Sequence, residues 1–399
     1  MEIKKTTNEK LIIMLAFTLL VFHTLTYLQN YYSFVATLAV FTAIVVLAFF
    51  KAKGKVDVKK NSSLIFLGFM LFIIVFMGVT LKNSSLITML GAYLPYVIWP
   101  ILYLIVDPIM DKKNKRVFLL LFLVVYTISV TATLSVVSVD NDAARLLAGA
   151  ASDTVRAFYY EQGVGGYGFI YGCVFLLYGL VLWMREEKNI VVKILLLAIC
   201  IVTFIMIIYA SYTTALLLSL ILVFLTFYAL SNKKYATIVF VVAILLAALL
   251  MDPILELIYN LAEQLELDWI AKRIGQLLNA EESGSYGELN RSMLYMRSLN
   301  TFWEHMFLGG TKIGGHSMFL DHMGKYGIFG MIFGVAYFAW LNTLRKLSGR
   351  RIGFVYVLFA VFLCINTMDT MVLLPMVQLA LPLMLSMVSE QSNGEVLIK

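Results

Sequence analysis

Two arginines and a histidine late in the chain are the residues best suited to chemistry. Arg291 and Arg297 precede His316 in a stretch without a long apolar run. Residues 252–316 carry a net charge of −4, but residues 289–316 hold three basic residues against one acidic residue. Arginine binds phosphate oxygens in pairs, and histidine exchanges a proton near neutral pH. These residue types therefore allow a local anion site beside a proton acceptor.

Three more arginines, Arg145, Arg156 and Arg273, lie outside the apolar runs. Each either contacts substrate or anchors the chain to lipid phosphate, and the sequence leaves both roles open. The pair Asp140 and Asp142 has the spacing of a divalent-cation site. The same pair could instead cap a short helix over 143–150.

The composition predicts an integral membrane protein. Apolar residues make up 61% of the chain and the mean hydropathy is +0.88, against roughly 45–50% apolar residues in soluble domains. A helix crosses the bilayer core with about 20 apolar residues, and backbone groups in lipid must be satisfied within the helix itself. Twelve spans are expected near 11–28, 32–50, 63–81, 86–106, 117–137, 165–184, 191–209, 213–230, 236–251, 324–343, 352–368 and 372–388.

The placement of lysine and arginine predicts the topology. With the N-terminus inside, 22 of the 31 basic residues fall in inner segments and nine in outer ones, as the positive-inside rule requires. Both termini are then cytoplasmic. The first apolar run continues directly into a second and has no small-residue cleavage site, so we expect it to remain as a helix. The net charge of +7 reflects topology and gives no indication of nucleic-acid binding.

Two outer segments are long enough to build a site. The expected organisation is nine spans over 1–251 with an outer loop at 138–167, a large outer helical loop over 252–325, and three spans with a cytoplasmic tail over 326–399. In the large loop, apolar residues at helical spacing from Ile254 to Leu277 predict an amphipathic helix on the outer membrane surface. A second helix is expected from near Leu289, with Met296, Leu299, Trp303 and Met306 on one face.

Residues 290–330 resemble the bacterial O-antigen polymerase and O-antigen ligase family. The resemblance rests on Asn290-Arg291, Arg297, Trp303, Phe307-Leu308-Gly309-Gly310, Gly314-Gly315-His316-Ser317 through Asp321, and Gly327-Ile328-Phe329-Gly330. Phe307 stands where the family usually has proline, and Ser317 where it often has asparagine. The ligases often carry a Ser-Arg pair that Ala210-Ser211-Tyr212-Thr213-Thr214 lacks, which favours the polymerase.

The resemblance implies a GT-C-like all-α fold and a metal-independent glycosyltransferase without a cofactor, in the bacterial cytoplasmic membrane. Its donor would be a polyprenyl-pyrophosphate-linked glycan, and its acceptor a hydroxyl of a second lipid-linked repeat unit, at the outer face. His316 and Arg291 would be catalytic. Arg297, Arg156, Arg273, Arg145 and Asp321 would bind pyrophosphate or glycan. Membrane lipid, a chain-length regulator and a flippase are the further expected partners.

Two alternatives remain open on the sequence. A ligase would share the site and differ only in its acceptor. A transporter or flippase for lipid-linked oligosaccharides would use broken helices, for which Pro95 and Pro100 in one span are candidates. The central spans are almost free of ionisable residues, which favours an enzyme over a transporter.

Overall fold

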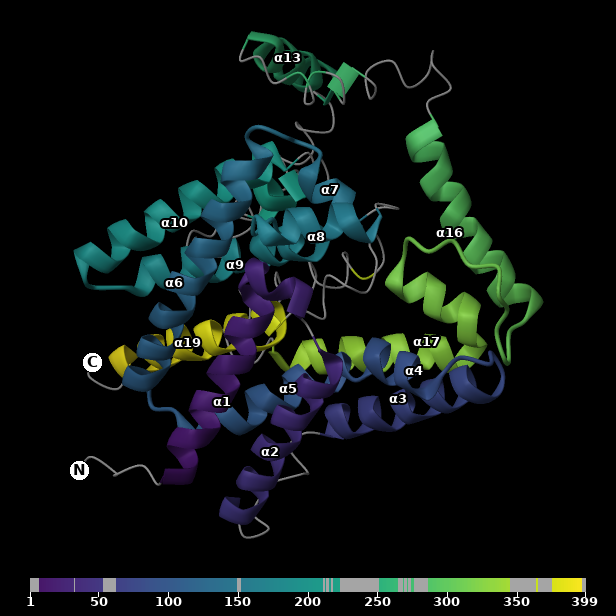
Figure 1. Ribbon diagram of the computed structural model, residues 1–399, viewed down its shortest axis with the longest axis horizontal. Coiled ribbons are helices and arrows are strands. Elements are labelled where there is room, and N and C mark those ends of the chain that lie inside the picture. Colours follow the sequence, from purple (N-terminus) through teal and green to yellow (C-terminus); the bar gives the residue numbers. More distant parts are fainter. Residues whose placement is uncertain are drawn as a thin grey trace.

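The computed structural model describes residues 7–31, 33–52, 62–148, 152–210, 212, 215–216, 218–222, 251–264, 268, 271, 274–275, 286–344, 364 and 375–396. Within these ranges the chain is helical, and no strand occurs (Figure 1). The helices are α1 (Thr7–Thr24), α2 (Phe34–Ala52), α3 (Ser62–Thr80), α4 (Leu86–Tyr93), α5 (Pro95–Val106), α6 (Lys112–Val137), α7 (Ala143–Ala148), α8 (Asp153–Glu161), α9 (Tyr167–Glu186), α10 (Ile190–Tyr209), α13 (Met251–Gln264), α16 (Tyr286–Glu304), α17 (Met318–Leu344) and α19 (Leu381–Val396). Shorter helical turns cover Thr26–Tyr31, Asp107–Ile109 and Met376–Ala380.

Five described helices are long and apolar enough to cross a membrane. They are α3, α6, α9, α10 and residues 318–342 of α17. A sixth span is possible if α4 and the helix that begins at Pro95 count as one, with a bend of 48° between them. The prediction of an all-helical chain with membrane-spanning helices is thus confirmed for this part of the chain. Most residues of the expected spans 213–230, 236–251 and 352–368 lie outside the described residues.

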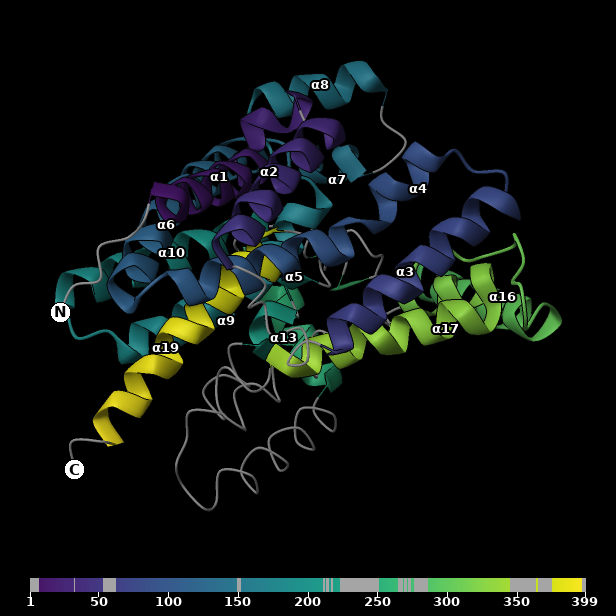
Figure 2. The same ribbon diagram turned by 90° about the horizontal axis from the view of Figure 1, so that it is seen from below.

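Helix α3 shows how the sequence produces a candidate span with one exposed apolar side. Phe66, Phe69, Phe72 and Phe76 are exposed along one side, a surface that suits hydrocarbon better than water. The other side is buried and packs against α17, so that the two helices lie alongside each other (Figures 1 and 2).

The core is built around α9, most of whose side chains are buried. Helix α19 packs on it at Gly179, where an added Cβ would lie 2.6 Å from Leu381 Cδ1. At one end of the bundle, buried Lys115 Nζ lies 2.9 Å from Asp107 Oδ1 and donates to Ser386 Oγ at 3.0 Å. Because Asp107 directly follows α5 and Ser386 lies on α19, these contacts join α6 to the end of α5 and to α19.

Helix α17 is folded back on itself at Gly327, whose φ is +61°. The rings of Phe319 and Phe338 stack with centroids 5.4 Å apart, although 19 residues of straight helix would extend about 28 Å. An added Cβ at Gly330 would lie 1.8 Å from the His322 carbonyl oxygen. The expected span over 324–343 thus overlaps the candidate span at 318–342, and a left-handed glycine reverses the chain near its start.

The apolar residues expected on one face of the second outer helix do not form its buried side. In α16 the buried side chains include Ser298, Thr301 and Phe302, whereas Met296 and Trp303 are exposed. Small and polar residues form the inner face because neighbouring backbone approaches α16 too closely for large side chains.

Helix α13 confirms a helix within the expected amphipathic region. Its Ala262 is buried with Ile258 and Tyr259 against Ile208 near the end of α10, while Leu257 and Leu261 are exposed. The remainder of the expected helix is described only at isolated positions.

Candidate functional site

The candidate site is organised by one carboxylate that joins α16, α17 and the segment between them. Asp321 Oδ1 accepts a hydrogen bond from the Ser298 hydroxyl at 2.6 Å and from Gly315 N–H at 3.1 Å. Its Oδ2 accepts from Ser317 N–H at 2.9 Å. Ser298 Oγ also accepts from Gly314 N–H at 2.8 Å. Asp321 thus holds the backbone on both sides of His316.

The glycines of the family-like motif make this arrangement possible by permitting close backbone contact. An added Cβ at Gly314 would lie 2.2 Å from the Leu294 carbonyl oxygen, and one at Gly324 would lie 2.8 Å from that of Ser298. Gly309, with a φ of +69°, lies against the Lys325 carbonyl in the same way. These glycines therefore serve packing of the connecting segment against both helices, rather than contact with a ligand.

His316 is exposed and takes no part in capping the helix that follows it. The cap is Ser317, whose Oγ accepts from Leu320 N–H at 3.2 Å, while its carbonyl accepts from Asp321 N–H. The helix cap therefore belongs to Ser317 and not to His316. The imidazole is therefore presented from a backbone fixed on both sides.

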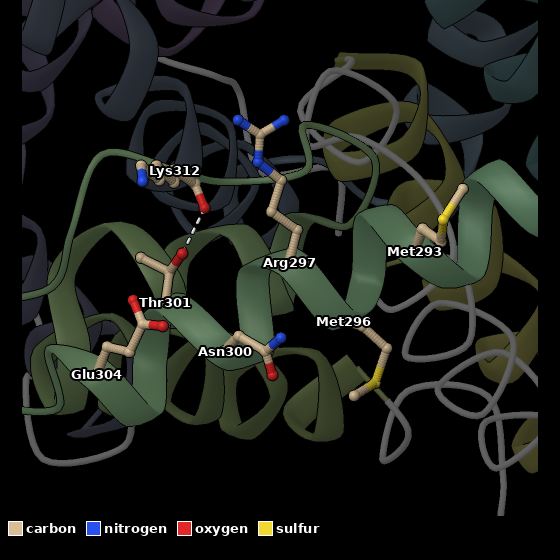
Figure 3. Close-up of a pocket in the computed structure, with 7 residues that line it drawn as sticks. All are labelled: Met293, Met296, Arg297, Asn300, Thr301, Glu304 and Lys312. Carbon is tan, nitrogen blue, oxygen red and sulfur yellow. Dashed lines mark hydrogen bonds between the residues drawn. The ribbon is translucent and has the colours of Figure 1, made fainter.

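A groove of about 370 Å³ runs along the exposed side of α16, beside the connecting segment. It is lined by Met293, Met296, Arg297, Asn300, Thr301, Glu304 and Lys312 (Figure 3). The Thr301 hydroxyl donates to the Lys312 carbonyl, which fixes the segment over the helix. Arg297 and Lys312 together outnumber the single carboxylate of Glu304. The groove therefore offers two cations beside apolar methionine side chains, a lining suited to an amphiphilic anion.

Lys82, in the turn between α3 and α4, links a membrane-spanning helix to the same segment. Its Nζ donates to the Gly309 carbonyl at 3.0 Å and lies 3.4 Å from that of Gly310. Partial burial, together with the nearby charge of Lys325, lowers the pKa of Lys82 below its usual value. The site segment is therefore attached to the end of α3.

The arginines of the first outer loop lie elsewhere. Arg145 is on α7 and Arg156 on α8, and both helices stand apart from α16 (Figure 2). Arg156 Nη1 is 4.0 Å from the exposed Asp153 carboxylate, a weak surface pair. Arg145 and Arg156 are therefore separated from Arg297 of α16.

Asp140 is engaged by protein groups in this first loop. Its Oδ2 accepts from the Tyr159 hydroxyl at 2.5 Å, and its Oδ1 accepts from Asp142 N–H at 3.1 Å. The bond to Asp140 raises the pKa of Tyr159. The carboxylate thus closes a turn ahead of α7, and no cluster of three metal-binding side chains occurs among the described residues.

Of the predicted site residues, the structure brings Arg297, His316 and Asp321 into one neighbourhood through Ser298. Arg291 lies on the same helix, seven residues before Ser298. Arg273 lies outside the described residues. Sequence reasoning did not single out Ser298, Thr301 or Lys312 as site residues. Lys312 could have been found as an outer basic residue between two glycine pairs, but the hydroxyl residues gave no distinguishing signal.

No protein-family model and no curated protein matches the chain.

Proposed function

We propose that the chain is a polysaccharide polymerase of the O-antigen, capsule or exopolysaccharide type. It acts at the outer face of the cytoplasmic membrane. It transfers a glycan from a polyprenyl-pyrophosphate donor to a hydroxyl of a lipid-linked repeat unit. One arrangement carries this proposal. His316 is exposed, and Asp321 holds the backbone on both sides of it. The same connecting segment contributes Lys312 to the groove that Arg297 also lines. Twelve spans, cytoplasmic termini and the outer loop over 252–325 belong to the same proposal.

The chemistry follows from these positions. Cleavage of the glycosyl–oxygen bond leaves negative charge on the pyrophosphate, which Arg297, Arg291 and Lys312 stabilise as it develops. His316 accepts the proton of the attacking hydroxyl as the new glycosidic bond forms. A groove with methionines beside its cations suits a leaving group that is attached to a prenyl chain.

Purified protein and a chemically defined lipid-linked repeat unit test this reaction. A polymerase produces a ladder of products on a gel, each longer by one repeat unit. A single addition to a different lipid acceptor would identify the ligase instead. The absence of any new glycosidic bond with either acceptor would refute both.

The topology is tested by cysteine labelling of intact cells. A cysteine at the exposed Ser152, before α8, should react with an impermeant reagent, whereas one at the exposed Lys113, at the start of α6, should react only after permeabilisation. The opposite pattern would place the groove on the cytoplasmic side and refute the proposed reaction.

One observation favours a second candidate, a transporter of lipid-linked oligosaccharide. The 48° bend between α4 and the following helix lies beside the folded-back α17, where the His322 ring is 5.5 Å from that of Tyr93 and 6.2 Å from that of Tyr96. Discontinuous helices of this kind are typical of transporters. Movement of a fluorescent lipid-linked glycan across proteoliposomes, without glycosidic bond formation, would support this function.

A further inference from the structure

Two turns form one exposed apolar surface at the end of α3. We call it the outer tip and define it by Leu81, Leu86, Ile87, Trp303, Phe307 and Leu308, all of which are exposed. Ile87 and Phe307 each expose 72% of their surface. The Lys82 hydrogen bond to Gly309 holds the α3–α4 turn against the turn that follows α16. Residues more than 200 positions apart thus contribute to a single surface.

The backbone of the tip is fixed. The amide of Ile328 donates to the Met306 carbonyl at 2.7 Å, and an added Cβ at Gly327 would lie 2.2 Å from that same carbonyl oxygen. Gly310 N–H donates to the Gly324 carbonyl at 2.8 Å. Because this backbone is fixed, Phe307 and Leu308 stay at the surface of the protein. No part of the chain that the structure describes covers them.

The position of the tip indicates what covers it. Helix α3 is a candidate membrane span that ends at Thr80, and Leu81 follows it directly. The exposed phenylalanines lie on α3, the helix that leads into the tip. Lys82 and Lys325 lie at its rim, and Lys325 Nζ is 5.2 Å from the ring centre of Tyr326. Tryptophan and lysine at the boundary of an apolar band are typical of residues at the membrane interface.

We propose that the outer tip is a phospholipid-binding surface, inserted into the outer leaflet of the bilayer. Phe307, Leu308 and Ile87 contact acyl chains, and Lys82 and Lys325 lie at the level of the lipid phosphates. Trp303 lies between these two layers. This insertion keeps the groove of α16 at the height where a lipid-linked pyrophosphate travels in the membrane plane. The proposal requires that α3 spans the membrane with Thr80 at its outer end, and it goes beyond the proposed glycosyl transfer.

Spin labels in lipid nanodiscs test the insertion on the full chain. Single cysteines at Phe307 and Ile87 are compared with one at Met296, which is also exposed but lines the groove, in a background with Cys173, Cys200 and Cys364 replaced by alanine. Labels at the tip should collide with oxygen several-fold more often than with a water-soluble nickel chelate, and the label at 296 should show the reverse. A nickel-accessible label at 307, or one sheltered from both reagents by protein, would overturn the proposal.

A second measurement needs no cysteine replacement. In nanodiscs that contain lipids brominated on the acyl chain, the wild-type protein should lose a component of its fluorescence that Trp303→Phe lacks. Equal quenching of both proteins would overturn the insertion. Neither measurement depends on turnover, so the failure of this proposal is distinguishable from failure of the proposed reaction.

Discussion

Ser298 donates a hydrogen bond to Asp321 across 2.6 Å, although 23 residues separate them. The bond joins the buried side of α16 to the first turn of α17, and each partner also holds a backbone amide of the intervening segment. A bond between a hydroxyl and a carboxylate is stronger than one between neutral groups. The position of His316 therefore depends on this pair.

Asp321→Asn should reduce activity through the position of His316. The amide retains one acceptor oxygen, but loses the charge and cannot accept at both positions. A hydrogen bond to a charged group contributes about 1.5–3 kcal/mol to stability, so the melting temperature in detergent should fall measurably.

Ser298→Ala is the companion variant, and it should act in the same direction. Because the two residues share one network, the double variant should lose less activity and stability than the two single losses combined. Strict additivity would show that the bond does not couple α16 to α17.

Arg297 on α16 and Arg156 on α8 are predicted to act independently. Arg297→Ala should lower turnover by about 10²–10³-fold if it stabilises charge in the transition state. Asn300→Ala, which removes an uncharged side chain from the same groove, should lose much less. Steady-state rates at saturating donor measure both.

Arg156→Ala tests whether Arg156 and Arg297 contact one bound substrate. Because α8 stands apart from α16, its effect should add to that of Arg297→Ala. A strong non-additive interaction between the two would mean that both residues contact one bound substrate.

Chelation should leave activity unchanged. Both oxygens of Asp140 are engaged by Tyr159 and by the amide of Asp142, which makes this pair a poor cation site. Initial rates before and after EDTA treatment measure the effect. A loss that magnesium or manganese restores would assign the pair to a metal.

Local sequence periodicity predicted the helices well where one side faces lipid and the other faces protein. The expected spans 63–81 and 191–209 agree within one residue with α3 and α10, because hydrocarbon imposes a fixed length on apolar helices. The bend after α4 was anticipated only as a possibility, from Pro95 and Pro100.

The candidate site was predicted less well than the spans, since its geometry depends on tertiary contacts. Gly327 appeared within a continuous apolar run, and composition gives no sign that φ becomes positive there. The sequence did not reveal the buried face of α16, where the approach of Gly314 and Gly324 selects small residues over the larger methionines. Ser298 and Thr301 acquire their roles only once these backbones meet.

Asp107→Asn should strongly destabilise the protein. Lys115 is almost completely buried beside Asp107, and removing one partner of a buried pair costs about 3–5 kcal/mol. The melting temperature measured in detergent should fall strongly. Glu186→Gln is the control, because the Arg185–Glu186 pair is partly exposed and 3.7 Å apart. Its effect should stay within about 0.5 kcal/mol. Equal effects of the two changes would mean that the Lys115–Asp107 pair does not contribute to stability as proposed.

His316→Ala should abolish most of the turnover and leave the fold intact. The side chain is exposed, the helix cap belongs to Ser317, and the backbone contacts of Gly315 and Ser317 do not involve imidazole. General-base assistance contributes about 10²–10⁴-fold, so the rate at saturating substrate should fall by that factor. The amount of protein in the membrane and its melting temperature should remain those of the wild type.

His305→Ala is the matched control for this histidine. His305 is also exposed, and it accepts the hydrogen bond from Gly309 N–H with its backbone carbonyl oxygen, which the substitution retains. It should polymerise within a few-fold of the wild-type rate. The decisive comparison is the product ladder of the two variants under one set of conditions. A normal ladder from His316→Ala would remove the general base from the proposed reaction. Loss of product only from His305→Ala would move the catalytic role to the end of α16, because the two residues differ in position and share the same chemistry.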